Sequence, residues 1–189
     1  MAKIRTFVAV DVSPGIRANA ARLIQELESS GAPYRWCQPE NLHITLNFLG
    51  DVLEQEVPQV CRLVEQACQG LTSFPIEVGL LDCLPNWEKP RTLWLQVAEG
   101  AERLADLNDR IATSLEEMRF PRERHDYQPH LTLGRIQRGG HRNQALLDRC
   151  QQFKSHIAGG CIVAQVIVYS SFLDRTGPSY TPMSRIELR

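Results

Sequence analysis

Two short segments of the sequence carry the same pattern of residues that could perform chemistry. The pattern His-x-Thr-Leu begins at His43 and recurs at His130. In each copy apolar residues alternate with polar ones, as on a β-strand, whose successive side chains point to opposite faces. His43 would then share a strand face with Thr45, and His130 with Thr132. A lone histidine on such a strand is usually a core residue, but the repetition favours one site built from both copies.

Two imidazoles with neighbouring hydroxyls suit acid and base chemistry on a phosphate. Histidine titrates near neutrality, so one imidazole can take a proton while the other supplies one. Threonine hydroxyls can donate to phosphoryl oxygens, and an arginine can stabilise the charge that grows in the transition state. These parts fit cleavage of a phosphodiester. A zinc site usually takes three or four His, Cys or carboxylate ligands, and neither motif has a second ligand at close spacing, so we expect no metal and no cofactor.

The composition is that of a globular protein without a general attraction to nucleic acid. The chain has 189 residues, of which 43% are hydrophobic and 23% charged, and its formal net charge is −1. Anion binding must therefore come from a local patch of positive charge. The segment 119–142 holds six arginines against two acids. These arginines are Arg119, Arg122, Arg124, Arg135, Arg138 and Arg142.

The six cysteines show neither a C-x-x-C motif nor the density of a disulfide scaffold. The apolar run near the N-terminus is too short for a signal peptide and lacks a cleavage site. No apolar stretch approaches the ~20 residues that span a membrane. We therefore expect reduced thiols and a cytoplasmic protein with no membrane partner, and we take the chain to be a monomer.

Periodicity predicts the elements that position the two motifs. Helical spacing of apolar residues indicates helices over 14–29, 57–68, 101–118 and 143–152, and strands are expected over 4–10, 74–81, 92–97, 161–169, 180–188 and the two motifs. Phe7 precedes His43 by 36 residues and Leu93 precedes His130 by 37. This repeat suggests two similar lobes related by an approximate two-fold. We expect one α+β unit over 1–189, with two mainly antiparallel sheets around a central cleft and helices on the outer faces.

At these residues the sequence resembles the two-histidine phosphoesterases, and among them the RNA 2′,3′-cyclic phosphodiesterases, also called 2′-5′ RNA ligases. The resemblance rests on Trp36, on 41–50 and on 129–135, and it extends over nearly the whole chain. It implies the bilobal two-histidine phosphoesterase fold and metal-independent opening of 2′,3′-cyclic phosphate ends of RNA or nucleotides to 2′-phosphates. It also implies some capacity to join RNA ends through a 2′-5′ bond.

The resemblance further implies roles for individual residues. By this match His43 is the proton donor, His130 is the proton acceptor, and Thr45, Thr132 and Arg135 contact the phosphate. On a straight strand Arg135 would face away from His130, because the two are five residues apart. A bulge or a strand end at Gly134 could turn it back.

Other positions leave the substrate open. Tyr127 and Gln128 stand where the family often has phenylalanine and a basic residue, and Gly134 stands where alanine is common. Phe7, Phe48 and Tyr127 could stack on a nucleobase, since every base offers a π-face. Core packing is nevertheless the expected role of Phe7 and Phe48.

Two other functions are compatible with the sequence. The first is a non-catalytic nucleotide- or RNA-binding module on the same fold. The second is a related phosphodiesterase that acts on a small cyclic phosphate, such as that of ADP-ribose, or on 2′-5′ oligonucleotides. Turnover of a nucleoside 2′,3′-cyclic phosphate would exclude the first, and a screen over cyclic-phosphate RNA, mononucleotides and 2′-5′ oligomers would separate the second.

Overall fold

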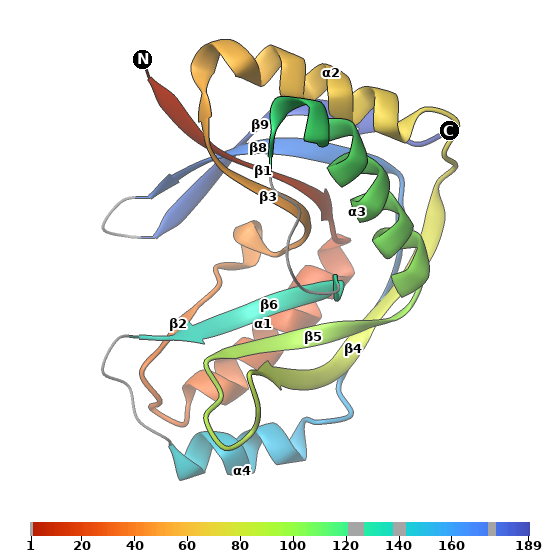
Figure 1. Ribbon diagram of the computed structural model, residues 1–189. Helices are drawn as coiled ribbons and strands as arrows, with labels where there is room; N and C mark the ends of the chain where they lie inside the picture. The colour runs from red at the N-terminus through yellow and green to blue at the C-terminus, as the bar shows by residue number, and fades with distance from the viewer. Residues whose placement is uncertain (1, 121–126, 138–142, 174–176) are drawn as a thin grey trace.

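The computed structural model describes residues 2–120, 127–137, 143–173 and 177–189 (Figure 1). Within these ranges the helices and strands follow in the order β1 (Lys3–Asp11), α1 (Pro14–Glu28), β2 (Tyr34–Trp36), β3 (His43–Leu53), α2 (Val57–Cys68), β4 (Phe74–Leu84), β5 (Thr92–Glu99), α3 (Ala101–Leu115), β6 (His130–Ile136), α4 (Gln144–Gln152), β7 (Ile157–Val163), β8 (Gln165–Leu173) and β9 (Pro178–Glu187). Short 3₁₀ segments precede β3 and α2 and follow α3. The four predicted helices are confirmed, with α3 ending in the 3₁₀ segment Glu116–Met118.

The described strands form one antiparallel sheet in two parts. The order across the sheet is β7-β4-β5-β6-β3-β1-β8-β9, and β2 pairs with β6. We name β1, β3, β8 and β9 the β1 lobe, and β2, β4, β5, β6 and β7 the β6 lobe. The lobes meet where β3 and β6 form one residue pair, Ile44 with Leu131. The predicted bilobal α+β architecture is confirmed, and the two expected sheets are continuous through this pair.

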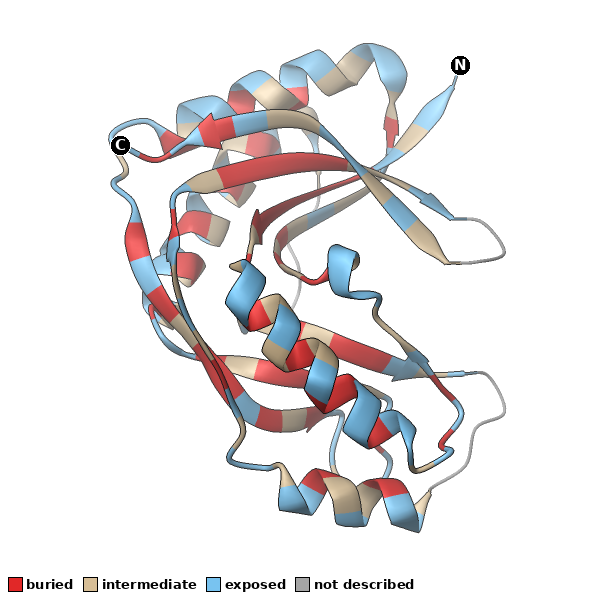
Figure 2. Ribbon diagram, turned by 180° about the vertical axis from the view of Figure 1, so that it is seen from behind, coloured by how far each residue is buried: buried red, intermediate tan, exposed pale blue. Residues whose placement is uncertain are grey.

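Two helices pack on each lobe of the sheet. Helices α2 and α3 pack together on the β1 lobe, where they contact β3, β8 and β9. Helices α1 and α4 pack on the β6 lobe, where α1 contacts β2, β6 and β7. Figure 2 shows α1 lying across the β6 lobe with its exposed residues turned outward. Since α1 follows a strand of the β1 lobe and α3 a strand of the β6 lobe, each of these helices covers the lobe opposite to its preceding strand.

Two strands differ from the prediction. The single strand expected over 161–169 is in fact the end of β7 and the start of β8, which separate at Ala164 and lie in different lobes. Strand β7 pairs with β4, whereas β8 pairs with β1 and β9. Apolar residues continue through the break, so no turn signal marks it. The three-residue strand β2 was also not expected, because so short a segment shows no periodicity and depends on its pairing with β6.

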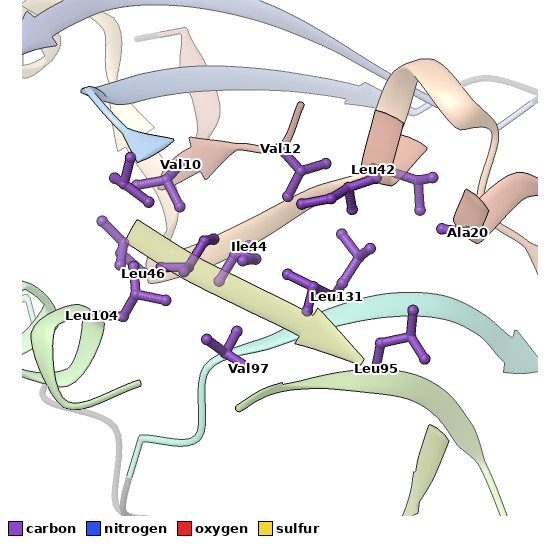
Figure 3. Packing of buried hydrophobic residues seen from close by; sticks show 14 of the residues in the cluster. Val10, Val12, Ala20, Leu42, Ile44, Leu46, Leu95, Val97, Leu104 and Leu131 are labelled. Carbon is purple, nitrogen blue, oxygen red and sulfur yellow. The ribbon is translucent and has the colours of Figure 1, made fainter. Parts of the chain in front are cut away.

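One hydrophobic cluster extends through both lobes. The apolar residues of the motifs belong to it as predicted: Leu42, Ile44, Leu46 and Leu131 are at most 1% exposed. Figure 3 shows them packed with residues of β1, β5, α1 and α3, among them Leu104. Because both lobes and the helices α1 and α3 contribute residues to the same core, we propose that residues 1–189 form one domain.

This arrangement predicts that the lobes unfold together. Leu107 is a buried residue of α3, on the β1 lobe, and its replacement with alanine should lower the free energy of unfolding by about 2–5 kcal/mol. The three tryptophans, Trp36, Trp87 and Trp94, all lie in the β6 lobe or its β4–β5 connection. In Leu107→Ala the urea midpoints from tryptophan fluorescence and from far-UV circular dichroism should fall by the same amount.

The matched control is Leu173→Ala at the exposed end of β8, which should shift neither midpoint because Leu173 is 62% exposed. A tryptophan midpoint that stays at the wild-type value in Leu107→Ala, while the dichroism midpoint falls, would show that the lobes are separate folding units.

Candidate active site

The pair between Ile44 and Leu131 orients both histidine motifs. Paired residues on neighbouring strands share a face of the sheet, and the residues next to them in the chain point to the other face. Both Ile44 and Leu131 are fully buried in the core. The opposite face, which we name the site face, therefore receives the four residues that flank the pair: His43, Thr45, His130 and Thr132. All four are partly buried, and none points into the core.

His43 is oriented by hydrogen bonds within its own segment. Its Nδ1 lies 2.7 Å from the carbonyl oxygen of Asn41, and because a carbonyl can only accept, Nδ1–H is the donor. Its Nε2 lies 3.0 Å from Oγ1 of Thr45. The rings of Phe7 and Tyr180 contact the imidazole, with centroids 5.0 and 5.2 Å away. The nitrogen that can exchange a proton with a bound group is therefore Nε2.

His130 has the same backbone partner but a different side-chain neighbour. Its Nδ1 donates to the carbonyl oxygen of Gln128 at 2.7 Å, which again leaves Nε2 for chemistry. The indole of Trp94 contacts the imidazole edge to face, with ring centroids 4.1 Å apart. Across the β5–β6 pairing His130 lies opposite Gln96, a neutral residue that donates to the Asp82 carboxylate at 2.8 Å.

A β-bulge in β6 turns Arg135 onto the site face. Thr132 pairs with Trp94 and Arg135 pairs with Thr92, so three steps along β6 correspond to two along β5. The extra residue makes a bulge between Thr132 and Gly134. Because Thr92 and Trp94 are two residues apart on a regular strand, they share a face, and so do their partners. The bulge expected near Gly134 is thus confirmed, and it brings Arg135 to the face of the histidines.

The two imidazoles and Arg135 lie within electrostatic reach of one another. Burial is the largest influence on the pKa of His43 and of His130, and it lowers both. The hydrogen bonds to the backbone carbonyls oppose this shift, and the positive charge of Arg135 adds to it in both cases. The charge of His43 also lowers the pKa of His130. One site therefore contains all three groups.

Asp11 distinguishes His43 from His130. It pairs with His43 across β1 and β3, in the place that Gln96 has for His130, and its carboxylate raises the pKa of His43 against the larger effect of burial. Asp11 Oδ1 accepts a hydrogen bond from the Tyr169 hydroxyl at 2.9 Å and forms an ion pair with Arg17 at 3.2 Å. These two partners fix the carboxylate in place. The Asp11 carboxylate raises the pKa of His43, and the positive charge of its partner Arg17 lowers it, whereas neither charge is among the influences on the pKa of His130.

Arg35 is a further residue of the site face that sequence analysis did not single out. It pairs with Arg135 across β2 and β6, and both side chains are exposed. Like charges directly opposite each other destabilise a sheet, and the ion pairs of the described residues include neither arginine. This arrangement is typical of a place that receives an anion. The pairing of β2 is the only signal, and the sequence does not reveal it.

The other candidates have mixed outcomes. Phe7 is 3% exposed, as expected for core packing, but Phe48 is 46% exposed, so the expectation of core packing was wrong for it. The Tyr127 hydroxyl donates to the carbonyl oxygen of Thr45 at 2.8 Å. Within the basic segment, four arginines lie outside the described residues: Arg122, Arg124, Arg138 and Arg142. The described residues include no group of three or more His, Cys, Asp or Glu side chains that could hold a metal ion, and all six cysteines are free thiols.

Comparisons with known proteins agree with this geometry. A model of the 2′-5′ RNA ligase superfamily matches residues 16–167. A protein of Methanothermobacter thermautotrophicus named RNA 2′,3′-cyclic phosphodiesterase is 34% identical over 98% of this chain and 100% of its own, and one of the same name from Archaeoglobus fulgidus is 32% identical over 97% and 100%. The crystal structure of TT0787 of Thermus thermophilus superposes with a TM-score of 0.83 at 24% identity, covering 98% of both chains. The crystal structure of Escherichia coli LigT complexed with 3′-AMP superposes with a TM-score of 0.75 at 19% identity, covering 98% of both chains. These two structural similarities show the fold.

The electrostatics of the site predict opposite effects of two substitutions on the histidines. Arg135→Gln removes a charge that lowers both pKa values, so the pKa of His43 and that of His130 should both rise. Asp11→Asn removes a charge that raises the pKa of His43 alone, so that pKa should fall while the pKa of His130 stays in place. The titration of the imidazole signals by NMR measures both values, and Arg119→Gln serves as a control with an exposed arginine. Unchanged pKa values in Arg135→Gln would show that Arg135 does not face the imidazoles.

Proposed function

Because the chain belongs to the 2′-5′ RNA ligase superfamily, we propose that it is an RNA 2′,3′-cyclic phosphodiesterase, which opens 2′,3′-cyclic phosphate ends to 2′-phosphates. The observation that carries the proposal is the presence on one sheet face of two imidazoles that each donate from Nδ1 to a carbonyl and keep Nε2 for proton transfer. Relatives of this name that align over their full length support the substrate class.

In the proposed reaction the two imidazoles act in opposite directions. Nε2 of neutral His130 takes a proton from a water molecule as its oxygen attacks phosphorus, and Nε2 of protonated His43 gives a proton to the departing 3′ oxygen. The new P–O bond forms as the bond to the 3′ oxygen breaks, which leaves a 2′-phosphate and a 3′-hydroxyl. His130 ends protonated and His43 neutral, so solvent must take one proton from His130 and return one to His43 before the next turnover.

The surroundings of the histidines support this division of roles. An acid must hold its proton until the leaving group departs, and the Asp11 carboxylate raises the pKa of His43 against burial and the charges of Arg17 and Arg135. A base must be neutral when water binds, and His130 faces the neutral side chains of Trp94 and Gln96, while the charge of His43 lowers its pKa.

Thr45, Thr132 and Arg135 are proposed to bind the phosphate. The hydroxyls can donate to the non-bridging oxygens, and the guanidinium can make two parallel hydrogen bonds to them as charge grows in the transition state. Thr45 Oγ1 already lies beside Nε2 of His43, at 3.0 Å. The same groups would serve ligation, because a 5′-hydroxyl of a second RNA end in place of water would form a 2′-5′ bond.

The proposal also includes a cellular location, an oligomeric state and a metal-independent reaction. None of the described helices combines the length and the apolar character needed to cross a membrane. The cytoplasmic location, the monomeric state and the independence of metals stay predictions. The last of these is tested directly by running every assay below in excess chelator.

The first test is turnover of a nucleoside 2′,3′-cyclic phosphate in excess EDTA, with the product identified by ³¹P NMR. The wild-type protein should release the 2′-phosphate, and His43→Ala and His130→Ala should each lose roughly 10²- to 10⁴-fold in rate, the range for general acid or base catalysis. Binding of the nucleotide without turnover would identify a non-catalytic module, and activity that appears only with added zinc or magnesium would refute the metal-independent reaction.

A second test separates acid from base by changing the leaving group. A nucleoside phosphodiester that expels p-nitrophenolate needs little protonation of its departing oxygen, so it should largely restore the rate of His43→Ala and leave His130→Ala slow. The unmutated protein must first be shown to cleave it. Selective restoration of His130→Ala would reverse the two roles.

A further inference from the structure

Phe48 lies on the site face because β3 contains a bulge that matches the one in β6. Thr45 pairs with Ala9 and Phe48 pairs with Phe7, so three steps along β3 correspond to two along β1. Phe48 therefore shares the face of Thr45, as Arg135 shares that of Thr132. Phe48 stands five residues after the first motif histidine, the same spacing that places Arg135 after the second.

The exposure of Phe48 is unusual for this part of the sheet. Its strand partner Phe7 is 3% exposed and packs against neighbouring rings, whereas Phe48 is 46% exposed. The guanidinium of Arg5 lies over the Phe48 ring, with Cζ 4.9 Å from the centroid. Arg5 is itself exposed. An aromatic ring and a cation thus lie together on the site face, and both remain exposed although Arg5 lies over one face of the ring.

Arg5 also belongs electrostatically to the site. Burial raises the pKa of Tyr180, and the charges of Arg135 and Arg5 lower it, so both arginines act on one side chain from the two lobes. The Tyr180 ring lies 5.2 Å from the His43 ring. Phe7, the strand partner of Phe48, has its ring 5.0 Å from the His43 ring, so Phe48 lies beside the residues that surround the proposed acid.

We propose that Phe48 and Arg5 bind the penultimate nucleotide of an RNA chain, the one before the nucleotide that carries the cyclic phosphate. The base stacks on the exposed part of the Phe48 ring, and Arg5 pairs with the backbone phosphate. The proposal rests on the proposed phosphodiesterase function and deepens it, because it makes an RNA end a better substrate than a mononucleotide.

Charge and distance favour this occupant. A nucleoside 2′,3′-cyclic phosphate carries one phosphate, which the histidines, the threonines and Arg135 receive. Phe48 lies four ladder steps from His43 along β3, or ~13 Å at the rise of a strand. Asp51 lies opposite Arg5 across β1 and β3, but the ion pairs among the described residues do not include Arg5. The guanidinium can therefore receive a further phosphate, which an RNA chain has and a mononucleotide lacks.

The test compares two substrates in the full-length protein, a tetranucleotide and a mononucleotide that both end in a 2′,3′-cyclic phosphate. Phe48→Leu and Arg5→Gln should each lower kcat/KM for the tetranucleotide by roughly 5- to 150-fold, the loss expected for one stacked base, through a higher KM. The mononucleotide should keep its kcat/KM within about twofold. Phe48→Tyr should keep most of the preference for the tetranucleotide, and Arg5→Gln alone should flatten the dependence of KM on salt.

The matched control is Phe172→Leu, which replaces another exposed phenylalanine, 69% exposed, on β8, which β1 separates from β3. It should leave both substrates unaffected. Equal losses on both substrates, or none on either, would overturn the proposal. Failure of the wild-type protein to turn over the mononucleotide would instead refute the proposed function itself, so the two failures are distinguishable.

Discussion

A single residue pair, Ile44 with Leu131, determines where the chemistry of this protein lies. It joins the two lobes of the described sheet, and both side chains are completely buried. Because paired residues share a face, their burial turns the flanking histidines and threonines to the other face. Each buried side chain contributes about 1.5–3 kcal/mol, and a slip of one residue would put an imidazole in the core instead. The hydrophobic effect therefore orients the polar residues of the site.

The two bulges explain why simple strand parity fails further along both motifs. Alternation on a straight strand places Phe48 with the core residues Ile44 and Leu46, and Arg135 with Leu131. In each strand one extra residue reverses the alternation after the threonine, so Phe48 and Arg135 join the site face. For Arg135 the neighbouring glycine indicated a bulge in the sequence. The structure shows why glycine is needed there, because a side chain at Gly134 would collide with the Trp36 ring. The bulge in β3 between Thr45 and Asn47 has no glycine beside it, because Gly50 belongs to a second irregularity after Phe48, and for that reason the exposure of Phe48 was not predicted.

Much of the fold follows from local periodicity, and what does not follow depends on strand pairing. The spacing of apolar residues predicts the helices, the motif strands and their buried leucines. The repeated His-x-Thr-Leu pattern predicts the histidines and threonines of the site. The separation of β7 from β8 at Ala164 could not be predicted, because an apolar run continues where the chain crosses between lobes. Asp11 and Arg35 were not predicted for a related reason. Asp11 lies opposite His43 and Arg35 lies opposite Arg135, and the register of these strand pairs is known only from the structure.

The two-fold repeat gives the two histidines similar surroundings, and residues on the neighbouring strands make these surroundings differ. Two equal halves would give both imidazoles the same proton affinity, yet an acid and a base must differ. The motifs are alike, with the same histidine, threonine and carbonyl hydrogen bond, so the difference must come from the strands across from them. Strand β1 places a carboxylate opposite His43, and β5 places an amide opposite His130. A symmetric frame thus directs both side chains to one face, and the neighbouring strands, which the motif pattern does not include, give each imidazole different surroundings, as the proposed acid and base require.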